Sequence, residues 1–232
     1  MKNAPLAIII LLLTGLPAWA QTSETIRVKS GERLAVGDKY LFPQFAVGTV
    51  QYRDGRTVSA QLNFNLLLRE MQFLNPPRLD TLALAREYTI KQILINDAKF
   101  VHDQKAGFMK ILGDYGGVRL AVTQSLQVGN VDKEAGYGQS SGVSSIKSVN
   151  NLPSDNGSIT RLSMKGDVMY SRRESYFLLD ENSLTYPANK KSVQKLFARH
   201  KSEIGDYIKD NSVQFGNAAD LKRLLEFCQG LN

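Results

Sequence analysis

The chain of 232 residues has few cysteines and histidines, the residues that form disulfide cross-links and bind zinc. It has one cysteine, which excludes an internal disulfide framework. That cysteine and only two histidines are too few soft ligands for a closed structural zinc site. After the first 20 residues, no apolar run approaches the roughly 20 residues needed to cross a bilayer. A packed hydrophobic core must therefore hold the fold, and a chain of this length can supply one.

The first 20 residues have the pattern of a cleaved signal peptide. Lys2 gives a positive start, residues 7–16 form a short apolar run, and residues 18–20 supply the small-x-small site of signal peptidase. We expect cleavage before Gln21. The residue directly after this site is Gln21 and not a cysteine, which argues against a lipid anchor. The mature protein is expected to be exported, either periplasmic or extracellular, without a transmembrane segment.

Between about residues 40 and 128, short runs rich in β-branched and aromatic residues show the period of two that is typical of strands. Turn-forming dipeptides such as Asp54-Gly55 and Gly116-Gly117 separate them. Parallel crossovers need a dozen or more connecting residues, so this spacing predicts an antiparallel meander. The expected strands are 48–52, 57–64, 70–74, 81–84, 89–95 and 118–122.

The first expected hairpin has two possible registers. A two-residue turn at Asp54-Gly55 places Val50 opposite Ser59. A three-residue loop over 53–55, with its glycine in the left-handed conformation, places Val50 opposite Val58 instead. The second register gathers the apolar side chains on one face, whereas a slip of one residue sends them all to the other face. We therefore predict the bulged loop.

The composition changes after the meander. Residues 133–158 are rich in glycine, serine and asparagine, and we expect a flexible loop there. A second β stretch follows at 168–179 and 184–186, which should complete the first sheet or pack over it.

After Pro187 the apolar period becomes that of a helix. Asn189 and Asn217 are expected N-caps, and Gly205 predicts a break near 201–205 with Ser202 capping the second piece. Cys228 is expected to be buried. The predicted fold class is α+β: a mainly antiparallel β domain at 21–187, as a sheet, sandwich or partly open barrel, with amphipathic helices at 188–232 packed on it.

Several runs in the chain form a recognisable set: 40–45, 48–55, 62–65, 70–73 and 80–84, with 187–191, 196–197, 207–209 and 221–227 in the tail. They resemble a group of exported proteins of unknown function from Bacteroidota-type bacteria. The resemblance implies export and a shared architecture. It brings no activity, cofactor or site residue with it.

Residues 138–142 fit the G-x-S-x-G pattern of serine hydrolases, with Ser140 as the nucleophile. Asp167 or Asp180, followed by His200, has the required chain order. That chemistry needs a strained turn between a buried strand and a helix, and the polar, Gly/Ser-rich flanks do not predict one. The hydrolase is therefore an alternative, and the leading expectation is a non-catalytic exported module of the cell envelope with no cofactor.

Two pairs of residues offer metal ligands, His102 with Asp103 and His200 with Glu203. A catalytic zinc needs three converging protein ligands. We therefore expect solvated charge pairs at both places and no metal site.

The remaining signal is basic charge. The chain carries a formal net charge of +7, and its tail contains a group of cations with few acids. This group is Lys190, Lys191, Lys195, Arg199, Lys201 and Lys209. It is either a solvated helix face or a contact for an anionic partner, such as envelope lipid or acidic glycan. A partner protein of the envelope is the other expectation, and nucleic acid is disfavoured because the protein is expected to be exported and shows no stacking platform.

Overall fold

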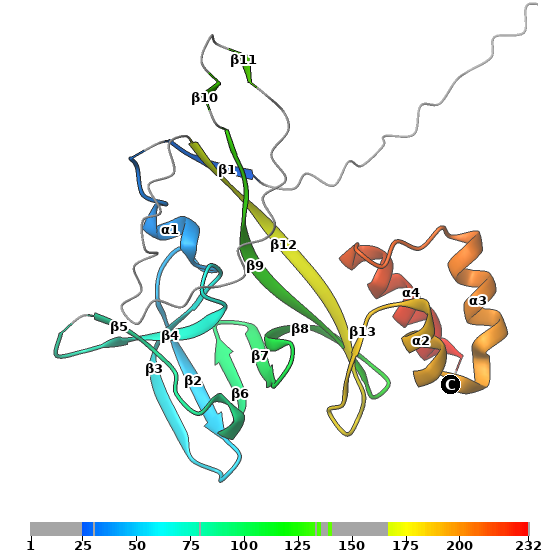
Figure 1. Cartoon of the computed structure of the whole chain (residues 1–232). Helices are drawn as coiled ribbons and strands as arrows, with labels where there is room; N and C mark the ends of the chain where they lie inside the picture. Colours follow the sequence, from blue (N-terminus) through cyan, green and yellow to red (C-terminus); the bar gives the residue numbers. More distant parts are fainter. Residues whose placement is uncertain are drawn as a thin grey trace, which may run out of the picture.

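A computed structural model of the chain describes residues 25–29, 31–78, 80–132, 134–135, 139–140 and 167–231. Within this part of the chain, 11 strands form one antiparallel sheet, and helices pack at one end of it (Figure 1). The order of neighbouring strands is β1-β12-β9-β8-β7-β6-β2-β3-β4-β5, with β13 also paired to β12. The sheet is open, so of the three predicted forms of the β domain the single sheet is confirmed.

The strands of the sheet are β1 (Thr25–Val28), β2 (Ala46–Tyr52), β3 (Thr57–Asn65), β4 (Glu70–Asn75), β5 (Asp80–Ala83), β6 (Ile90–Ile95), β7 (Ala98–Asp103), β8 (Gly107–Tyr115), β9 (Val118–Asp132), β12 (Asp167–Leu179) and β13 (Thr185–Pro187). A separate pair consists of β10 (Glu134–Ala135) and β11 (Gln139–Ser140). The helices are α1 (Val36–Lys39), η1 (Glu87–Thr89), α2 (Lys190–Leu196), η2 (Ala198–His200), α3 (Lys201–Asp210) and α4 (Ala218–Gly230).

The predicted antiparallel meander is confirmed. Strands β2 to β5 are neighbours in the order of the sequence, and so are β6 to β9. The pairing of β2 with β6 joins the two groups, and β12 adds beside β9. The second β stretch therefore completes the first sheet. Strands β1, β7 and β8 were not predicted from the sequence, and β9 extends ten residues beyond its predicted end.

The register of the first hairpin is the predicted one. Val50 lies opposite Val58, and the φ angle of Gly55 is +91°, which a residue with a side chain rarely adopts. The Tyr52 N–H donates to the Arg56 carbonyl at 2.9 Å and closes the loop. This register directs Val50 into the core, where it is 2% exposed. Of the apolar side chains that this register gathers on one face, Leu62 and Phe64 are also buried, whereas Val58 is 48% exposed.

The β half of the molecule encloses its own core because the sheet curls. Leu126 of β9 donates its N–H to the carbonyl of Leu66, in the turn after β3, at 2.9 Å. These two segments are five strands apart in the order of the sheet, so the sheet must bend to bring them together. The enclosed core includes Leu62, Ile93 and Phe100, each no more than 2% exposed.

The tail is helical as predicted, with one correction. Asn189 and Asn217 are the N-caps of α2 and α4. The break in the first helix lies at Phe197 to His200, before the predicted position, and Gly205 lies inside α3. Ser202 is therefore not a cap. Phe197 lies in the core and is 4% exposed. Burial of this ring explains the position of the break better than the low helix propensity of Gly205 does.

Two expectations fall mainly outside the described residues. Residues 1–20, the expected signal peptide, lie outside them. So does most of the expected flexible loop 133–158, of which only β10 and β11 are described. Among the helices of the described ranges, none has both the length and the apolar character to cross a membrane.

Candidate functional site

The helices α2, η2, α3 and α4 lie together against the end of the sheet formed by β8, β9, β12 and β13 (Figure 1). Their shared core contains Leu120 and Leu178 from the sheet and Val193, Ile204 and Leu224 from the helices, all 0% exposed. Since the apolar sides of the helices face the sheet, their polar sides face solvent. This arrangement decides which tail residues are available to a partner.

Helix α2 presents two of the predicted cations on one side. It begins at Asn189, whose side-chain oxygen accepts the N–H of Ser192 at 2.9 Å. Ser192 is buried, whereas Lys191 and Lys195, which are one helical turn apart, are exposed. Arg199 follows four residues later in η2 and is also exposed. We call Lys191, Lys195 and Arg199 the basic row.

The basic row lies in a stretch without acidic residues. Between residues 188 and 202 there are five basic residues and no aspartate or glutamate. Lys190 and Lys201 flank the row, and both are exposed. The sixth predicted cation, Lys209, is in the last turn of α3, close in sequence to Asp206 and Asp210. The structure therefore places five of the six cations on the consecutive elements α2, η2 and the first turn of α3, and Lys209 lies about two turns further on.

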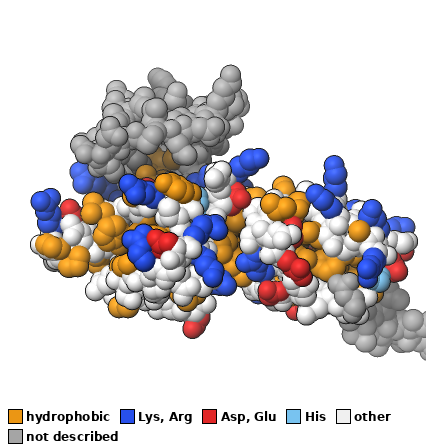
Figure 2. All heavy atoms as spheres, turned by 90° about the horizontal axis from the view of Figure 1, so that it is seen from below, with side chains coloured by type: hydrophobic (Ala, Val, Ile, Leu, Met, Phe, Trp, Pro, Cys, Tyr) orange, Lys and Arg blue, Asp and Glu red, His pale blue; other side chains and the backbone are white. Residues whose placement is uncertain are grey.

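These cations are not neutralised by neighbouring acids. Within the described part of the chain, none of the six forms an ion pair with a carboxylate. Lys195 lies over the ring of Tyr186, with its Nζ 4.7 Å from the ring centroid. A cation–π contact at an exposed site is worth about 0.5–1 kcal/mol, so it orients Lys195 without removing its charge. Figure 2 shows Lys and Arg side chains protruding from the helical end, on the right of the view, and from the β half as well.

The structure describes the side-chain contacts of Asp167, Asp180 and His200 among the residues of the alternative hydrolase. Ser140 belongs to β11, whose side chains lie outside the described residues. Asp167 pairs with Arg27 at 2.7 Å at the start of β12, while Asp180 follows the end of that strand and accepts the N–H of Leu184 at 2.8 Å. Because β12 has 13 residues, which span about 40 Å, the two aspartates are far apart.

His200, the third member of that set, lies at the helical end of the molecule. Its Nδ1 is 3.7 Å from an oxygen of Glu203, one turn further on, and its side chain is 25% exposed. Asp167 is at the other end of β12, so the structure does not bring it together with His200 (Figure 1). A hydrolase that uses Ser140 remains a prediction.

His102 has a different partner from the one that its sequence neighbour suggests. Its Nε2 is 2.9 Å from Glu87 of η1, and its ring packs edge-on against Phe108. Asp103, the neighbouring residue, accepts the N–H groups of Lys105 and Ala106, both at 2.8 Å. Burial by itself would raise the pKa of Asp103, but these hydrogen bonds stabilise the carboxylate and lower the pKa overall. In the residues that the structure describes, no three His, Cys, Asp or Glu side chains gather where they could hold a metal ion.

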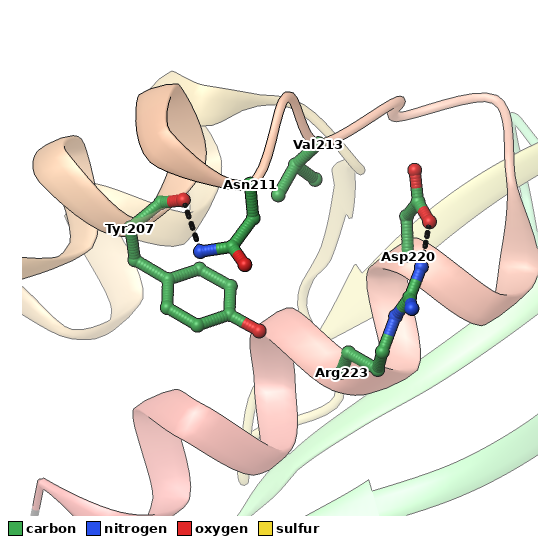
Figure 3. Close-up of a pocket in the computed structure, with 5 residues that line it drawn as sticks. All are labelled: Tyr207, Asn211, Val213, Asp220 and Arg223. Atoms are coloured by element: carbon green, nitrogen blue, oxygen red, sulfur yellow. Dashed lines mark hydrogen bonds and ion pairs between the residues drawn. The ribbon is translucent and has the colours of Figure 1, made fainter. Parts of the chain in front are cut away.

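A hollow between the end of α3 and the start of α4 is lined by Tyr207, Asn211, Val213, Asp220 and Arg223 (Figure 3). Its polar groups bond to one another. The Asn211 side chain donates to the Tyr207 carbonyl at 2.9 Å, and Arg223 donates to Asp220 at 2.5 Å. The other oxygen of Asp220 accepts the N–H of Gln214 at 2.9 Å. The hollow therefore ties the connection between the two helices together, and it presents few unused polar groups to a ligand.

The structure also contains a largely buried polar cluster that the sequence pattern does not predict. The hydroxyl of Tyr40 donates to the side-chain oxygen of Gln72 at 2.8 Å, and the amide of Asn65 donates to the same oxygen at 3.3 Å. The Gln72 amide in turn donates to Glu70 at 2.6 Å. Burial raises the pKa of Tyr40, so its hydroxyl stays protonated as the donor.

The members of this cluster come from the segments 40–45, 62–65 and 70–73. Together with Asn63 they fasten the segment before β2 onto β3 and β4. Most of their polar atoms bond within the protein, so the cluster stabilises the fold and does not form a binding site.

No protein-family model, curated protein or solved structure matches the chain. Function is therefore inferred from the burial, charge and contacts of the described residues. On these criteria the basic row, with Lys190 and Lys201 beside it, is the best candidate for a functional surface.

Proposed function

We propose that the protein is a non-catalytic module of the cell envelope that binds an anionic surface through the basic row. One observation carries the proposal: five cations follow one another along α2, η2 and the start of α3, all exposed, with no acid between residues 188 and 202. The location in the envelope rests on the signal-like first 20 residues. Lipid headgroups and acidic glycans share the negative charge that such a surface attracts.

The physics of this binding sets its size and its salt dependence. A basic residue close to an anionic membrane contributes about 1 kcal/mol of attraction. Three cations in the row, with two more beside them, therefore support reversible binding of several kcal/mol. Salt screens exposed charges over about 10 Å at 0.1 M, so the affinity must fall as ionic strength rises.

The test measures co-sedimentation of the chain starting at Gln21 with phosphatidylcholine vesicles that contain or lack phosphatidylglycerol. A second arm uses a soluble acidic polysaccharide, which separates lipid from glycan. The test variant reverses the three charges of the row: Lys191→Glu, Lys195→Glu and Arg199→Glu. The control variant makes the same change in net charge at exposed positions of the β half: Arg78→Glu, Lys91→Glu and Lys105→Glu.

We expect the unaltered protein and the control variant to bind one of the two anionic ligands at low salt, with the control weakened only modestly. We expect the row variant to lose at least a hundredfold in affinity, because three attractive terms become repulsive. Equal losses in both variants would mean that net charge alone drives binding, and the row would have no special role. No binding of the unaltered protein to either ligand at low ionic strength would refute the proposal.

A further inference from the structure

The turn between β12 and β13 carries an exposed leucine. Leu184 is 57% exposed, whereas Leu68 and Leu82, the other exposed leucines of the described part of the chain, are each 42% exposed. A single apolar side chain at a protein surface is common and needs no explanation by itself. Leu184 is of interest because of its position relative to the basic row and because the turn that carries it is fixed.

The register of β13 places Leu184 on the face of the sheet that the helices cover. Tyr186 lies opposite Leu178 of β12, and Leu178 is buried in the core beneath the helices. The Asp180 N–H donates to the Leu184 carbonyl at 3.2 Å, which continues the pairing of β12 with β13 by one position. Side chains two residues apart along a strand point to the same face, so Leu184 and Tyr186 lie on this face about 7 Å apart.

Tyr186 connects this leucine to the basic row. The Nζ of Lys195 lies 4.7 Å from the centre of the Tyr186 ring, so β13 lies beside α2 (Figure 1). Lys191 and Arg199 precede and follow Lys195 by four residues each. An apolar side chain, an aromatic ring and several cations therefore lie next to one another. Proteins that bind at the membrane–water interface present this combination of side chains.

Hydrogen bonds fix the turn that carries Leu184. The Asp180 carboxylate accepts the N–H of Leu184 at 2.8 Å and the hydroxyl of Tyr186 at 3.3 Å. Arg119 of β9 donates to the Asp180 carbonyl at 3.3 Å and to the Ser183 hydroxyl at 3.0 Å. Because the backbone of the turn is already ordered, a ligand that covers Leu184 does not have to order it.

The turn also contains two acidic residues, and their positions decide whether an anionic ligand can approach Leu184. The Asp180 carboxylate is engaged by the hydrogen bonds within the turn. The Glu181 carboxylate lies against the turn between β8 and β9, since a Cβ added at Gly117 would lie 2.5 Å from its Oε1. β9 and β13 pair with opposite edges of β12, so Glu181 leans away from the side on which Leu184 lies.

We propose that the anionic surface bound by the basic row is a lipid bilayer, and that Leu184 inserts into it beside the headgroups that the row contacts. The proposal rests on the proposed function and narrows it from two ligands to one. A bilayer has anionic headgroups at its surface and hydrocarbon directly beneath them, so it matches both the cations and Leu184. An acidic glycan matches the cations alone.

Tryptophan fluorescence tests the insertion. The single tryptophan of the sequence is Trp19, so the chain starting at Gln21 has none. Leu184→Trp places a reporter at the proposed contact, and Leu82→Trp places a matched reporter on β5, in the β half. With phosphatidylcholine vesicles that contain phosphatidylglycerol, at low salt, we expect Leu184→Trp alone to show a blue shift and quenching by brominated lipid. Vesicle-bound protein with an unshifted Leu184→Trp, or with equal shifts of both reporters, would overturn the proposal.

Removal of the apolar side chain gives a second measurement. Leu184→Ser should weaken binding to the same vesicles about tenfold, because the protein no longer buries the leucine in hydrocarbon. Leu82→Ser is the matched control and should bind as the unaltered protein does. Neither substitution changes the net charge, so equal affinities of the two variants for the vesicles would count against insertion.

The two measurements separate the insertion of Leu184 from the proposed function. Binding to the vesicles without insertion, or binding to the acidic polysaccharide alone, would overturn the lipid proposal while the row still binds an anionic surface. Failure to bind either ligand would overturn both.

Discussion

The side chain of Asn63 fastens the segment before β2 onto the sheet, and its replacement by aspartate tests that role. Asn63 is 1% exposed. Its oxygen accepts the N–H groups of Phe42 and Phe64 at 3.1 and 2.9 Å. Its amide nitrogen donates to the carbonyls of Phe42 and Gln44 at 2.9 and 3.2 Å. Asn63→Asp keeps the two acceptor bonds, removes both donor bonds and places a carboxylate against two carbonyls.

The magnitude follows from these contacts. Leaving a buried polar group without its partner costs about 1–3 kcal/mol, so two carbonyls give about 2–6 kcal/mol. A protein of this size unfolds with a total of about 5–15 kcal/mol, so the loss is a large part of its stability. For a chain of about 200 residues, each kcal/mol lowers Tm by about 2–4 °C. We therefore expect Tm to fall by roughly 5–20 °C at pH 7.

The penalty must also depend on pH in a defined direction. The introduced carboxyl is buried among carbonyl oxygens, so folding raises its pKa above the value of the unfolded chain, about 3.9. A group with a raised folded-state pKa destabilises most when it is ionised, and the penalty shrinks as pH falls toward its unfolded-state pKa. The protonated carboxyl can then donate to one carbonyl again.

Thermal and urea unfolding of the unaltered protein and the variant, from pH 7 to pH 4, measures both effects. Gln61→Glu is the matched control, because it introduces the same charge on β3 at an exposed position, where we expect a change within about 0.5 kcal/mol. The reasoning is refuted if Asn63→Asp costs less than about 1 kcal/mol at pH 7. It is also refuted if the cost does not shrink on acidification.

Three further predictions follow from single contacts. Burial raises the pKa of the Cys228 thiol to about 12, so a thiol reagent should label the native protein only as fast as it opens; rapid native labelling would contradict this. Gly48→Ala should lower the unfolding free energy by about 1–3 kcal/mol, because the added Cβ would lie 2.6 Å from the Leu94 carbonyl oxygen, whereas Gly37→Ala meets no atom within 4 Å and should be neutral. Asp103→Ala should lower the unfolding free energy by about 1–3 kcal/mol at neutral pH. Because folding lowers the pKa of Asp103, this difference in unfolding free energy should disappear as pH falls below about 4. A difference that stays constant with pH in chemical unfolding would refute the prediction.

The sequence predicts those parts of the fold that local rules govern. The hairpin register follows because only the bulged loop gathers Val50, Leu62 and Phe64 on one face. The two asparagine caps follow because their side chains satisfy the first backbone N–H groups of a helix. Gly205 misleads because a helix tolerates one glycine when packing on both sides of it is favourable.

The parts that the sequence does not predict depend on contacts distant in sequence. Residues 62–66 are all buried, so β3 is covered on both faces there, and Asn63 and Asn65 are internal although their alternation with apolar residues is typical of a solvent-facing side. The partner of β1 is β12, far along the chain, and no local signal specifies that pairing. The same applies to the candidate site: the cations can be read from the sequence, but their exposure depends on how the helices pack on the sheet.

The most direct test of the proposed function is residue-resolved NMR of the chain starting at Gln21, titrated with phosphatidylglycerol-containing bicelles and with the acidic polysaccharide at low salt. We predict that, with at least one of these ligands, the largest changes occur at Lys191, Lys195 and Arg199, and that they fade as salt is added. Changes centred on the β half, or changes at the row that persist at high salt, would contradict the account.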